Sequence, residues 1–334
     1  MHILVINSGS SSIKFSIFDA GQDAAPDPGI SDRAPWPRAL FAGEITGIGG
    51  AKLEFTFRDA KGRELNPGAP KENTSKDPVT LLEGAVCGPG MPAVAAVGYR
   101  VVHPGAVLDQ HQRITDQVLK ELEQAVVFAP LHDPAAIALI RDMMGRFPQA
   151  RHYACFDTIF HHTMPAAAST YAIPLEYREQ GVRRYGFHGL SCESVVDEMR
   201  AAAERGQARF PQRMVIAHLG SGCSVTAVLD GRSVDTSMGL TPTGGVVMGT
   251  RPGDLDPGLV LYLLRQADGD RTAAMNSVET VLNHKAGMVA LSKRSSALSN
   301  SQKMRHCFTN RRIWKESVSC CEFYCRTLLC WEKM

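Results

Sequence analysis

The stretch from Asp235 to Gly258 constrains the fold more than any other part of the chain. It reads D-T-S-M-G-L-T-P-T-G-G-V-V-M-G-T-R-P-G-D-L-D-P-G, and its six glycines and three prolines exclude a long helix or a regular strand. Because glycine permits close backbone approach and proline fixes turns, we expect a loop of defined shape. Its central charge, Arg251, has a guanidinium fork that suits phosphate or carboxylate oxygens. The stretch therefore predicts either an anion-binding loop or a surface loop with a solvated arginine.

The charge and cysteine content of the chain divide at about residue 292. The residues from Lys293 to Met334 contain nine of the 36 Lys and Arg, three of the 34 Asp and Glu, five of the nine cysteines, and neither Gly nor Pro. The net charge of +2 thus belongs to this final segment, and the body before it has an acidic balance and no nucleic-acid footprint. The cysteine spacing of the segment matches no zinc site, and its composition indicates an unrelated or out-of-frame ending.

The rest of the composition is that of a soluble globular protein, with 44% hydrophobic and 21% charged residues. No apolar run is long enough to span a membrane, and the apolar N-terminus is too short for a signal peptide. Four scattered cysteines in the body suit free thiols in a reducing compartment. We therefore expect a cytoplasmic protein with two domains and no membrane partner.

The first strands surround a turn rich in serine and glycine. The apolar patterns of His2–Ile6 and Ile13–Ile17 predict two strands, and Asn7–Ser11 forms the turn between them. The hydroxyl and N–H groups of the turn suit a phosphate, with Lys14 as the nearby charge. Most turns of this composition are only turns, so this signal is weak by itself.

Charged side chains stand where apolar strands end. Arg100 lies in the apolar run 93–102, where an unpaired arginine is costly, so we expect it to be paired or to face a site. Asp157 follows the strand 153–156, a position where α/β folds place site residues, although a helix cap explains it equally well. Asp133-Pro134 predicts a helix start, which puts His132 beside an N-terminus that favours anions.

The second half repeats the strand–turn–strand pattern of the N-terminus. Strands are expected at 214–219 and 224–229 around Gly220–Gly222, and Asp230-Gly231 predicts a type I′ hairpin turn. A shift of 211 positions superimposes Gly9 on Gly220. The repeat indicates a duplicated domain with two small-residue turns around one polyphosphate, unless the two hairpins are alike by chance.

Helices are expected where capping residues precede apolar periodicity. Thr115 precedes a helix with Leu119 and Leu122 on one face, and Ser191 is expected to cap a helix at 192–203. Further helices are expected at 258–266, after Asp256-Pro257, and at 277–286.

Seven ordered motifs give the chain a family resemblance. They are N-S-G-S-S-S-I-K-F at Asn7–Phe15, R-V-V-H at Arg100–His103, A-P-L-H-D-P at Ala129–Pro134, F-D-T-I-F-H at Phe156–His161, R-R-Y-G-F-H-G at Arg183–Gly189, H-L-G-S-G at His218–Gly222 and the loop Asp235–Gly258. Together they resemble the acetate kinase family, within the acetate and sugar kinase, Hsp70 and actin superfamily. The resemblance implies an α/β fold of duplicated ribonuclease H-like (actin-like ATPase) domains, with mixed central sheets and a cleft between them. The domains would be 1–150 and an incomplete 151–292, followed by 293–334 without family resemblance.

The resemblance also implies a function: reversible phosphoryl transfer from ATP to acetate, giving acetyl phosphate and ADP, with Mg²⁺ or Mn²⁺. The protein would be a cytoplasmic homodimer that serves acetyl-CoA biosynthesis. By motif position, Arg100 and Arg251 would hold acetate and the transferring phosphoryl group from the two sides of the cleft. His188 would donate a hydrogen bond to the transition state, and Asp157 would orient metal and substrate.

The same resemblance implies binding positions around these residues. Asn7 would approach the metal ion. The pocket for the acetate methyl group would comprise Val102, Leu131, Phe187 and Pro242, with His132 beside them. The nucleotide phosphates would contact Lys14, Ser10, Ser12, His218, Leu219, Gly220, Ser221 and Gly222.

The motifs stop after Ser292. The family continues with a glycine and a Ser-Ser-Asp-x-Arg segment that contacts the nucleotide, whereas residues 293–298 read K-R-S-S-A-L. A later Gly-Gly-Ile-Gly-Glu-Asn adenosine loop and a metal-binding glutamate are missing too. Two hypotheses follow: an acetate kinase that retains activity, or a truncated, catalytically dead paralogue that at most binds acyl phosphate or a partner protein.

Overall fold

The computed structural model describes residues 1–9, 11–21, 37–50, 52–65, 77–130 and 133–292. These residues divide into two compact units. The first comprises Met1–Ile159 and Asp197–Arg209, and the second comprises Phe160–Val196 and residues 210–292. Ser10, Leu131, His132 and the final segment 293–334, all of which the sequence analysis singles out, lie outside the described residues.

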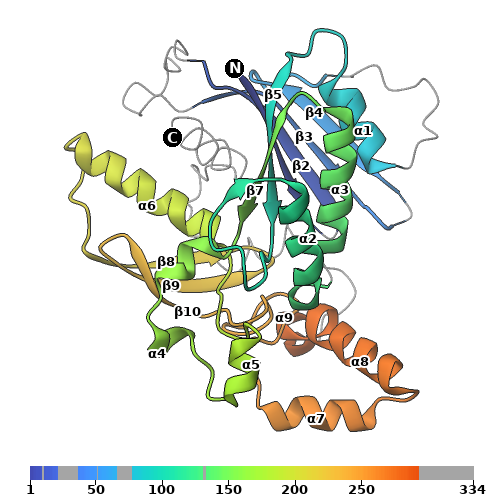
Figure 1. The fold of residues 1–334 in the computed structure, drawn as a ribbon, viewed down its shortest axis with the longest axis vertical. Coiled ribbons are helices and arrows are strands. Elements are labelled where there is room, and N and C mark those ends of the chain that lie inside the picture. Colours follow the sequence, from blue (N-terminus) through green and yellow to red (C-terminus); the bar gives the residue numbers. More distant parts are fainter. Residues whose placement is uncertain (10, 22–36, 51, 66–76, 131–132, 293–334) are drawn as a thin grey trace. The chain divides into compact units, whose positions relative to one another are not determined.

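The first unit is built on a mixed seven-stranded sheet (Figure 1). Strands β1 to β4 form an antiparallel meander, β5 runs parallel to β1, β7 runs parallel to β5, and β6 is antiparallel to β7. The strand order is β4-β3-β2-β1-β5-β7-β6. The bounds are β1 (His2–Ser8), β2 (Ser12–Asp19), β3 (Arg38–Thr46), β4 (Glu54–Asp59), β5 (Val94–Val101), β6 (Gln112–Arg113) and β7 (Arg151–Phe156).

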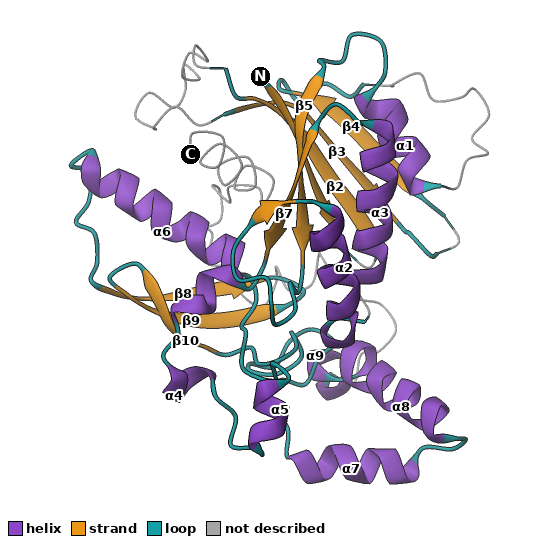
Figure 2. Ribbon diagram, in the orientation of Figure 1, coloured by secondary structure: helices purple, strands orange, loops and turns teal. Residues whose placement is uncertain are grey.

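Helices α1 (Pro78–Val86), α2 (Asp116–Ala125) and α3 (Asp133–Arg146) complete the first unit, with a 3₁₀ turn η1 at Val126–Phe128. As predicted, Thr115 caps α2, and its hydroxyl oxygen accepts a hydrogen bond from the Val118 amide at 3.3 Å. Helices α1 and α3 lie along the sheet (Figure 2), and one apolar core joins their buried faces to it. Burial of these apolar side chains is the main force that holds the unit together.

The second unit contains a three-stranded antiparallel sheet in the order β10-β9-β8. Its strands are β8 (Arg213–Leu219), β9 (Cys223–Leu229) and β10 (Arg232–Thr236). The turn between β9 and β10 has positive φ at both Asp230 and Gly231, which confirms the predicted type I′ hairpin. In both units a hairpin joined by a small-residue turn is followed by a third antiparallel strand, β3 beside β2 and β10 beside β9. This repeat agrees with the predicted class of duplicated α/β domains.

Helix α6 (Gly189–Glu204) packs Cys192 and Val196 against Ile216 of β8 and Val228 of β9. The prediction that Ser191 caps this helix is wrong, because the helix already begins at Gly189. Ser191 lies in the first turn, and its hydroxyl bonds to His218 instead.

The remaining helices of the second unit are short. Asp256 caps α7 by accepting a hydrogen bond from the Gly258 amide at 2.7 Å. The helix predicted at 277–286 in fact starts at Arg271, because Asp270 caps it through the Ala273 amide at 2.9 Å. The elements are η2 (Ile159–Thr163), α4 (Ala166–Ser169), α5 (Leu175–Glu179), α7 (Pro257–Gln266), α8 (Arg271–Thr280), the π-turn η3 (Val281–Lys285) and α9 (Gly287–Leu291). Within the described ranges, no helix is both long and apolar enough to cross a membrane.

Candidate active site

Three polar side chains of the first unit meet at one edge of its sheet. Asn7 lies near the end of β1, Arg100 near the end of β5, and Asp157 directly after β7. These strands are parallel neighbours, so their carboxyl ends lie together, which is where α/β sheets place ligand sites. Arg100 Nη2 donates to Asp157 Oδ2 at 2.6 Å, and Arg100 Nη1 donates to Asn7 Oδ1 at 3.3 Å. The expectation that Arg100 is paired is therefore confirmed.

The Arg100–Asp157 pair is only partly accessible, with side-chain exposures of 22% and 4%. A charge-assisted hydrogen bond this short fixes the plane of the guanidinium, and its desolvated surroundings strengthen the attraction. Asp157 therefore holds Arg100 in one orientation. Arg100 is thus oriented before any ligand arrives.

Asp157 and Asn7 also supply oxygen donors of the kind that Mg²⁺ prefers. Within the described ranges, no group of three or more His, Cys, Asp or Glu side chains could hold an ion by itself. Magnesium sites of phosphotransferases use one or two protein carboxylates and complete the shell with substrate phosphate and water. One carboxylate and one amide oxygen fit that pattern.

Lys14 and Ser12 lie on β2, the second strand of the hairpin that β1 and β2 form. Lys14 Nζ makes an ion pair with Glu44 Oε1 at 3.5 Å, and both side chains are about half exposed, at 54% and 42%. An exposed pair of this kind contributes little stability, about 0–1 kcal/mol, and a phosphate could replace the carboxylate at small cost. Ser12 is half-buried at the start of β2.

Val102 and Asp133 are buried beside this edge of the sheet, at 6% and 1% exposure. Burial raises the pKa of Asp133 to about 7, against the opposing effects of the nearby His103 and Val102 amides and of the Arg100 charge. No atom of the described residues makes a full hydrogen bond to either carboxylate oxygen. The sequence predicts only a helix start at Asp133, because no local pattern indicates its burial.

Two histidines of the second unit stack on each other. The His188 and His218 rings have centroids 4.0 Å apart, and each ring shares a hydrogen bond through Nδ1 with a serine hydroxyl. His188 pairs with Ser224 at 2.9 Å and His218 with Ser191 at 3.0 Å. His188 also adopts a φ of 61°, which is rare for a residue with a side chain and is typical of functional positions.

Gly222 lies beside both His188 and Arg251. A Cβ atom at this glycine would lie 3.3 Å from His188 Nε2 and 3.5 Å from Arg251 Nη1. The structure therefore brings these three predicted residues of the second unit together. Because Gly222 has no side chain, the space next to a histidine edge and an arginine fork stays open to a small anion.

The loop that carries Arg251 has a defined shape, as predicted. Gly245 and Gly253 both have positive φ, and the Gly245 amide donates to Asp254 Oδ1 at 2.7 Å. Arg251 Nη1 donates to the Pro242 carbonyl at 3.0 Å, so the guanidinium and Pro242 lie together. The Arg251 side chain is half-buried. A loose surface loop with a solvated arginine therefore does not describe it.

Phe187 is fully buried next to His188, and a third histidine holds its backbone. His161 Nε2 donates to the Phe187 carbonyl at 3.1 Å, while its Nδ1 pairs with Ser233 Oγ at 3.0 Å. Sequence reasoning missed this His161–Ser233 contact and the two serines that bond His188 and His218. The available signal was a polar side chain at an inward position of an apolar strand, as at Ser224 and Ser233.

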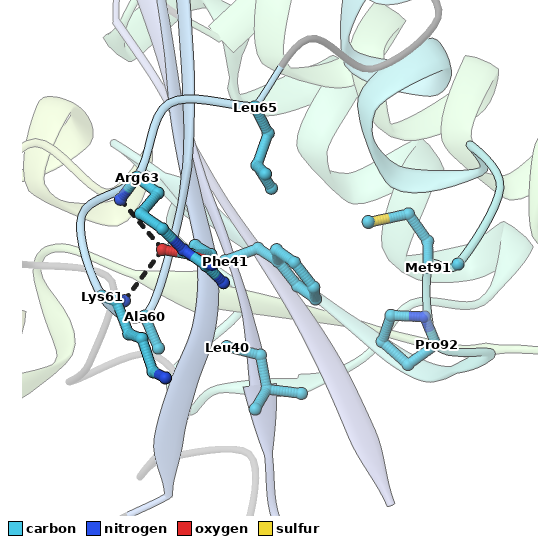
Figure 3. Close-up of a pocket in the computed structure, with 10 residues that line it drawn as sticks. Leu40, Phe41, Ala60, Lys61, Arg63, Leu65, Met91 and Pro92 are labelled. Atoms are coloured by element: carbon cyan, nitrogen blue, oxygen red, sulfur yellow. Dashed lines mark hydrogen bonds and ion pairs between the residues drawn. The ribbon is translucent and has the colours of Figure 1, made fainter.

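A pocket of about 520 Å³ in the first unit lies outside this set of residues. Figure 3 shows apolar side chains, among them Phe41, Leu65 and Met91, around its space. At one side the Asp59 carboxylate accepts hydrogen bonds from the Lys61 and Arg63 amides and from Arg63 Nε. None of the residues predicted for the site lines this pocket. The Asp59 carboxylate is already hydrogen-bonded to Lys61 and Arg63 within its own turn.

Comparisons with known proteins agree on one family. The family model described as the acetokinase family matches residues 2–326. The acetate kinase of Deinococcus radiodurans is 41% identical over 294 residues, which are 87% of this chain and 68% of that protein. The acetate kinase of Oceanobacillus iheyensis is 38% identical over 299 residues, covering 89% and 70%. Among solved structures, an acetate kinase from Entamoeba histolytica (29% identity, TM-score 0.67) covers 89% of this chain and 69% of that one. The match to a propionate kinase from Francisella tularensis (34% identity, TM-score 0.66) covers 86% of this chain and 69% of that one.

Proposed function

Since the chain belongs to the acetokinase family, we infer that it transfers a phosphoryl group reversibly between ATP and acetate. Acetate kinases at 36–41% identity, each matched along most of this chain, support that reaction. The products in the forward direction are acetyl phosphate and ADP. The acceptor carboxylate is already ionised at neutral pH, so the reaction needs no strong base.

The observation that carries this function is the meeting of His188 and Arg251 at Gly222. A phosphoryl group in transfer spreads negative charge over its equatorial oxygens, and catalysis consists mainly of positioning and electrostatic stabilisation. A guanidinium fork and an imidazole N–H are donors suited to that charge. We assign Arg251 to the phosphoryl oxygens and His188 to a hydrogen bond that is strongest in the transition state.

We assign Arg100 to the acetate carboxylate, because Asp157 already holds its guanidinium in one orientation. Asp157 and Asn7 would hold Mg²⁺, which when bound neutralises charge on the phosphate oxygens. Asp157 thus has two tasks, to orient Arg100 and to offer an oxygen ligand. Mn²⁺ is the alternative ion in this proposal.

By motif position alone, we propose that the methyl group of acetate contacts Val102, Leu131, Phe187 and Pro242, with His132 beside them. The nucleotide phosphates would contact Lys14, Ser12 and the turn His218–Gly222, with Ser10 proposed on the motif. On the resemblance to the family, we also propose that the protein is cytoplasmic and forms a homodimer. Light scattering of the purified chain would test the dimer.

A hydroxamate assay for acetyl phosphate tests the reaction directly. The purified full chain is given ATP, acetate and Mg²⁺, and acetyl hydroxamate is compared with that from Arg251→Ala and from Arg265→Ala, an arginine near the end of α7. We expect product from the chain and from Arg265→Ala, and almost none from Arg251→Ala. Product no higher than that of Arg251→Ala would support the alternative, a catalytically dead paralogue.

A further inference from the structure

Ser224 is the buried partner of the proposed catalytic histidine. It lies on β9 opposite His218 of β8 in the strand register and has no exposed surface. Its hydroxyl lies 2.9 Å from Nδ1 of His188, and this is a contact between side chains from separate elements. The serine comes from a strand, whereas His188 directly precedes α6 and has a strained φ of 61°. The strand therefore sets the direction of the ring.

A neutral imidazole carries one proton, on either Nδ1 or Nε2. If the Ser224 hydroxyl donates to Nδ1, the proton is on Nε2, and that nitrogen lies on the side of Gly222 and Arg251. If Nδ1 carries the proton and donates to Ser224, Nε2 presents a lone pair to the same space. An anion held by Arg251 would be repelled by the lone pair and attracted by the N–H.

The stacked ring of His218 makes this choice matter. Two imidazolium ions with centroids 4.0 Å apart repel each other, so the stack disfavours positive charge on the two rings at the same time. The Arg251 guanidinium, which lies with His188 beside Gly222, disfavours positive charge on His188 in particular. A neutral His188 can donate to an anion only in the form that carries its proton on Nε2. His161 and Ser233 show the same arrangement. The Phe187 carbonyl accepts a hydrogen bond from His161 Nε2, so in a neutral ring Nδ1 accepts one from the Ser233 hydroxyl.

We propose that Ser224 is a positioning residue that donates to His188 Nδ1 and thereby keeps the Nε2–H of His188 directed at the transferring phosphoryl group. This role rests on the proposed phosphoryl transfer. Ser224 itself touches no substrate. Its effect passes through the orientation and the proton position of His188.

The test compares Ser224→Ala with Thr226→Val in the full chain. Thr226 lies two residues along β9, is equally buried, and bonds to Thr236 Oγ1 at 2.9 Å instead of to a histidine. Both variants lose one buried hydroxyl from the same strand, so a general weakening of β9 affects both. NMR of histidine labelled with ¹³C and ¹⁵N distinguishes the two neutral forms and the imidazolium, and the spectrum of His188→Gln identifies the His188 signals.

We expect the wild-type chain and Thr226→Val to show neutral His188 with its proton on Nε2, and Ser224→Ala to show a mixture of forms. In the hydroxamate assay, kcat of Ser224→Ala should fall about 10- to 100-fold with a smaller change in KM, as for other residues that orient a site group through one hydrogen bond. A wild-type His188 that is protonated on Nδ1 or positively charged at neutral pH would overturn the proposal, and so would an unchanged His188 spectrum in Ser224→Ala. If the wild-type chain makes no acetyl phosphate, the proposed function fails, while the NMR result still decides the role of Ser224.

Discussion

Replacing Gly222 with alanine should damage the site more than the fold. The backbone admits the change, since the φ of Gly222 lies outside the left-handed region that favours glycine. The new Cβ would lie 3.3 Å from both Cε1 and Nε2 of His188, closer than the about 3.5–4.0 Å of an ordinary contact. The His188 ring, or the turn, must therefore move by a few tenths of an ångström.

The ring has little freedom to move. Ser224 holds Nδ1 at 2.9 Å, and His218 stacks on one face at 4.0 Å. Overpacking of this kind costs about 1–3 kcal/mol. If the displacement of His188 and Arg251 raises the free energy of the transition state by this amount, kcat/KM falls by about 5- to 150-fold.

The assay is acetyl hydroxamate formation at several acetate concentrations, with urea unfolding of the same samples. Gly249→Ala is the matched control, because a Cβ there meets only the Ser221 carbonyl oxygen at 3.7 Å, an ordinary contact. We expect Gly249→Ala to retain kcat/KM within about threefold, and both variants to show the same unfolding transitions as the unsubstituted chain. If Gly222→Ala were as active as Gly249→Ala, Gly222 would not lie beside the reacting group, and the assignment of His188 and Arg251 to it would lose its main support.

Three further predictions concern the chemistry and the pH dependence. Arg251→Ala should lower kcat by about 10³-fold or more, because an arginine acts on the charge of the transition state, and near-normal kcat in the hydroxamate assay would contradict its role. Propionate should be a poor but real substrate, since one methylene in an apolar pocket changes binding by only about 1–3 kcal/mol, and kcat/KM measured for both acids in one preparation checks this. The pKa of Asp133 is raised from its ordinary value of 3.8 to about 7 in the folded chain. Between pH 3.8 and pH 7 the folded chain therefore binds more protons than the unfolded chain, and the free energy of unfolding falls as the pH rises through this range. Asp133→Asn removes this loss. The difference in unfolding free energy between Asp133→Asn and the unsubstituted chain, measured by urea unfolding, should therefore grow by about 2–3 kcal/mol between about pH 5 and pH 8, and a difference that does not vary with pH would show that Asp133 does not titrate there.

The strands were predictable because their signal is local. Alternation of apolar residues predicts β2, and the Asp230-Gly231 pair predicts the turn between β9 and β10, since each pattern depends on a few neighbouring residues. The sequence predicts the start of helix α8 six residues too late, because the capping contact of Asp270 with the Ala273 amide is not evident from the sequence. Local patterns thus fix the kind of element better than its bounds.

Sequence motifs propose residues for the candidate site but give no information on the contacts between them. Motifs named Arg100, Asp157, His188 and Arg251, but the sequence carries no sign that Asp157 holds Arg100 or that Ser224 holds His188. These contacts join residues 57 and 36 positions apart, and they exist only because the fold brings separate strands and turns together. The buried state of Asp133 has the same origin.

The glycine-rich loop also has a consequence for how the chain can change during evolution. Main-chain hydrogen bonds fasten it to the start of α9: the Ala286 amide donates to the Thr250 carbonyl at 3.2 Å and the Met288 amide to the Met248 carbonyl at 2.9 Å. Gly287 fits only because it has no side chain, since a Cβ there would lie 2.3 Å from the Met248 carbonyl oxygen. The segment that contains α7 and α8 therefore begins and ends at positions that these hydrogen bonds hold together. Insertions and deletions within this segment should be tolerated without moving Arg251, whereas the hydrogen-bonded residues 248–250 and 286–288 should accept almost none.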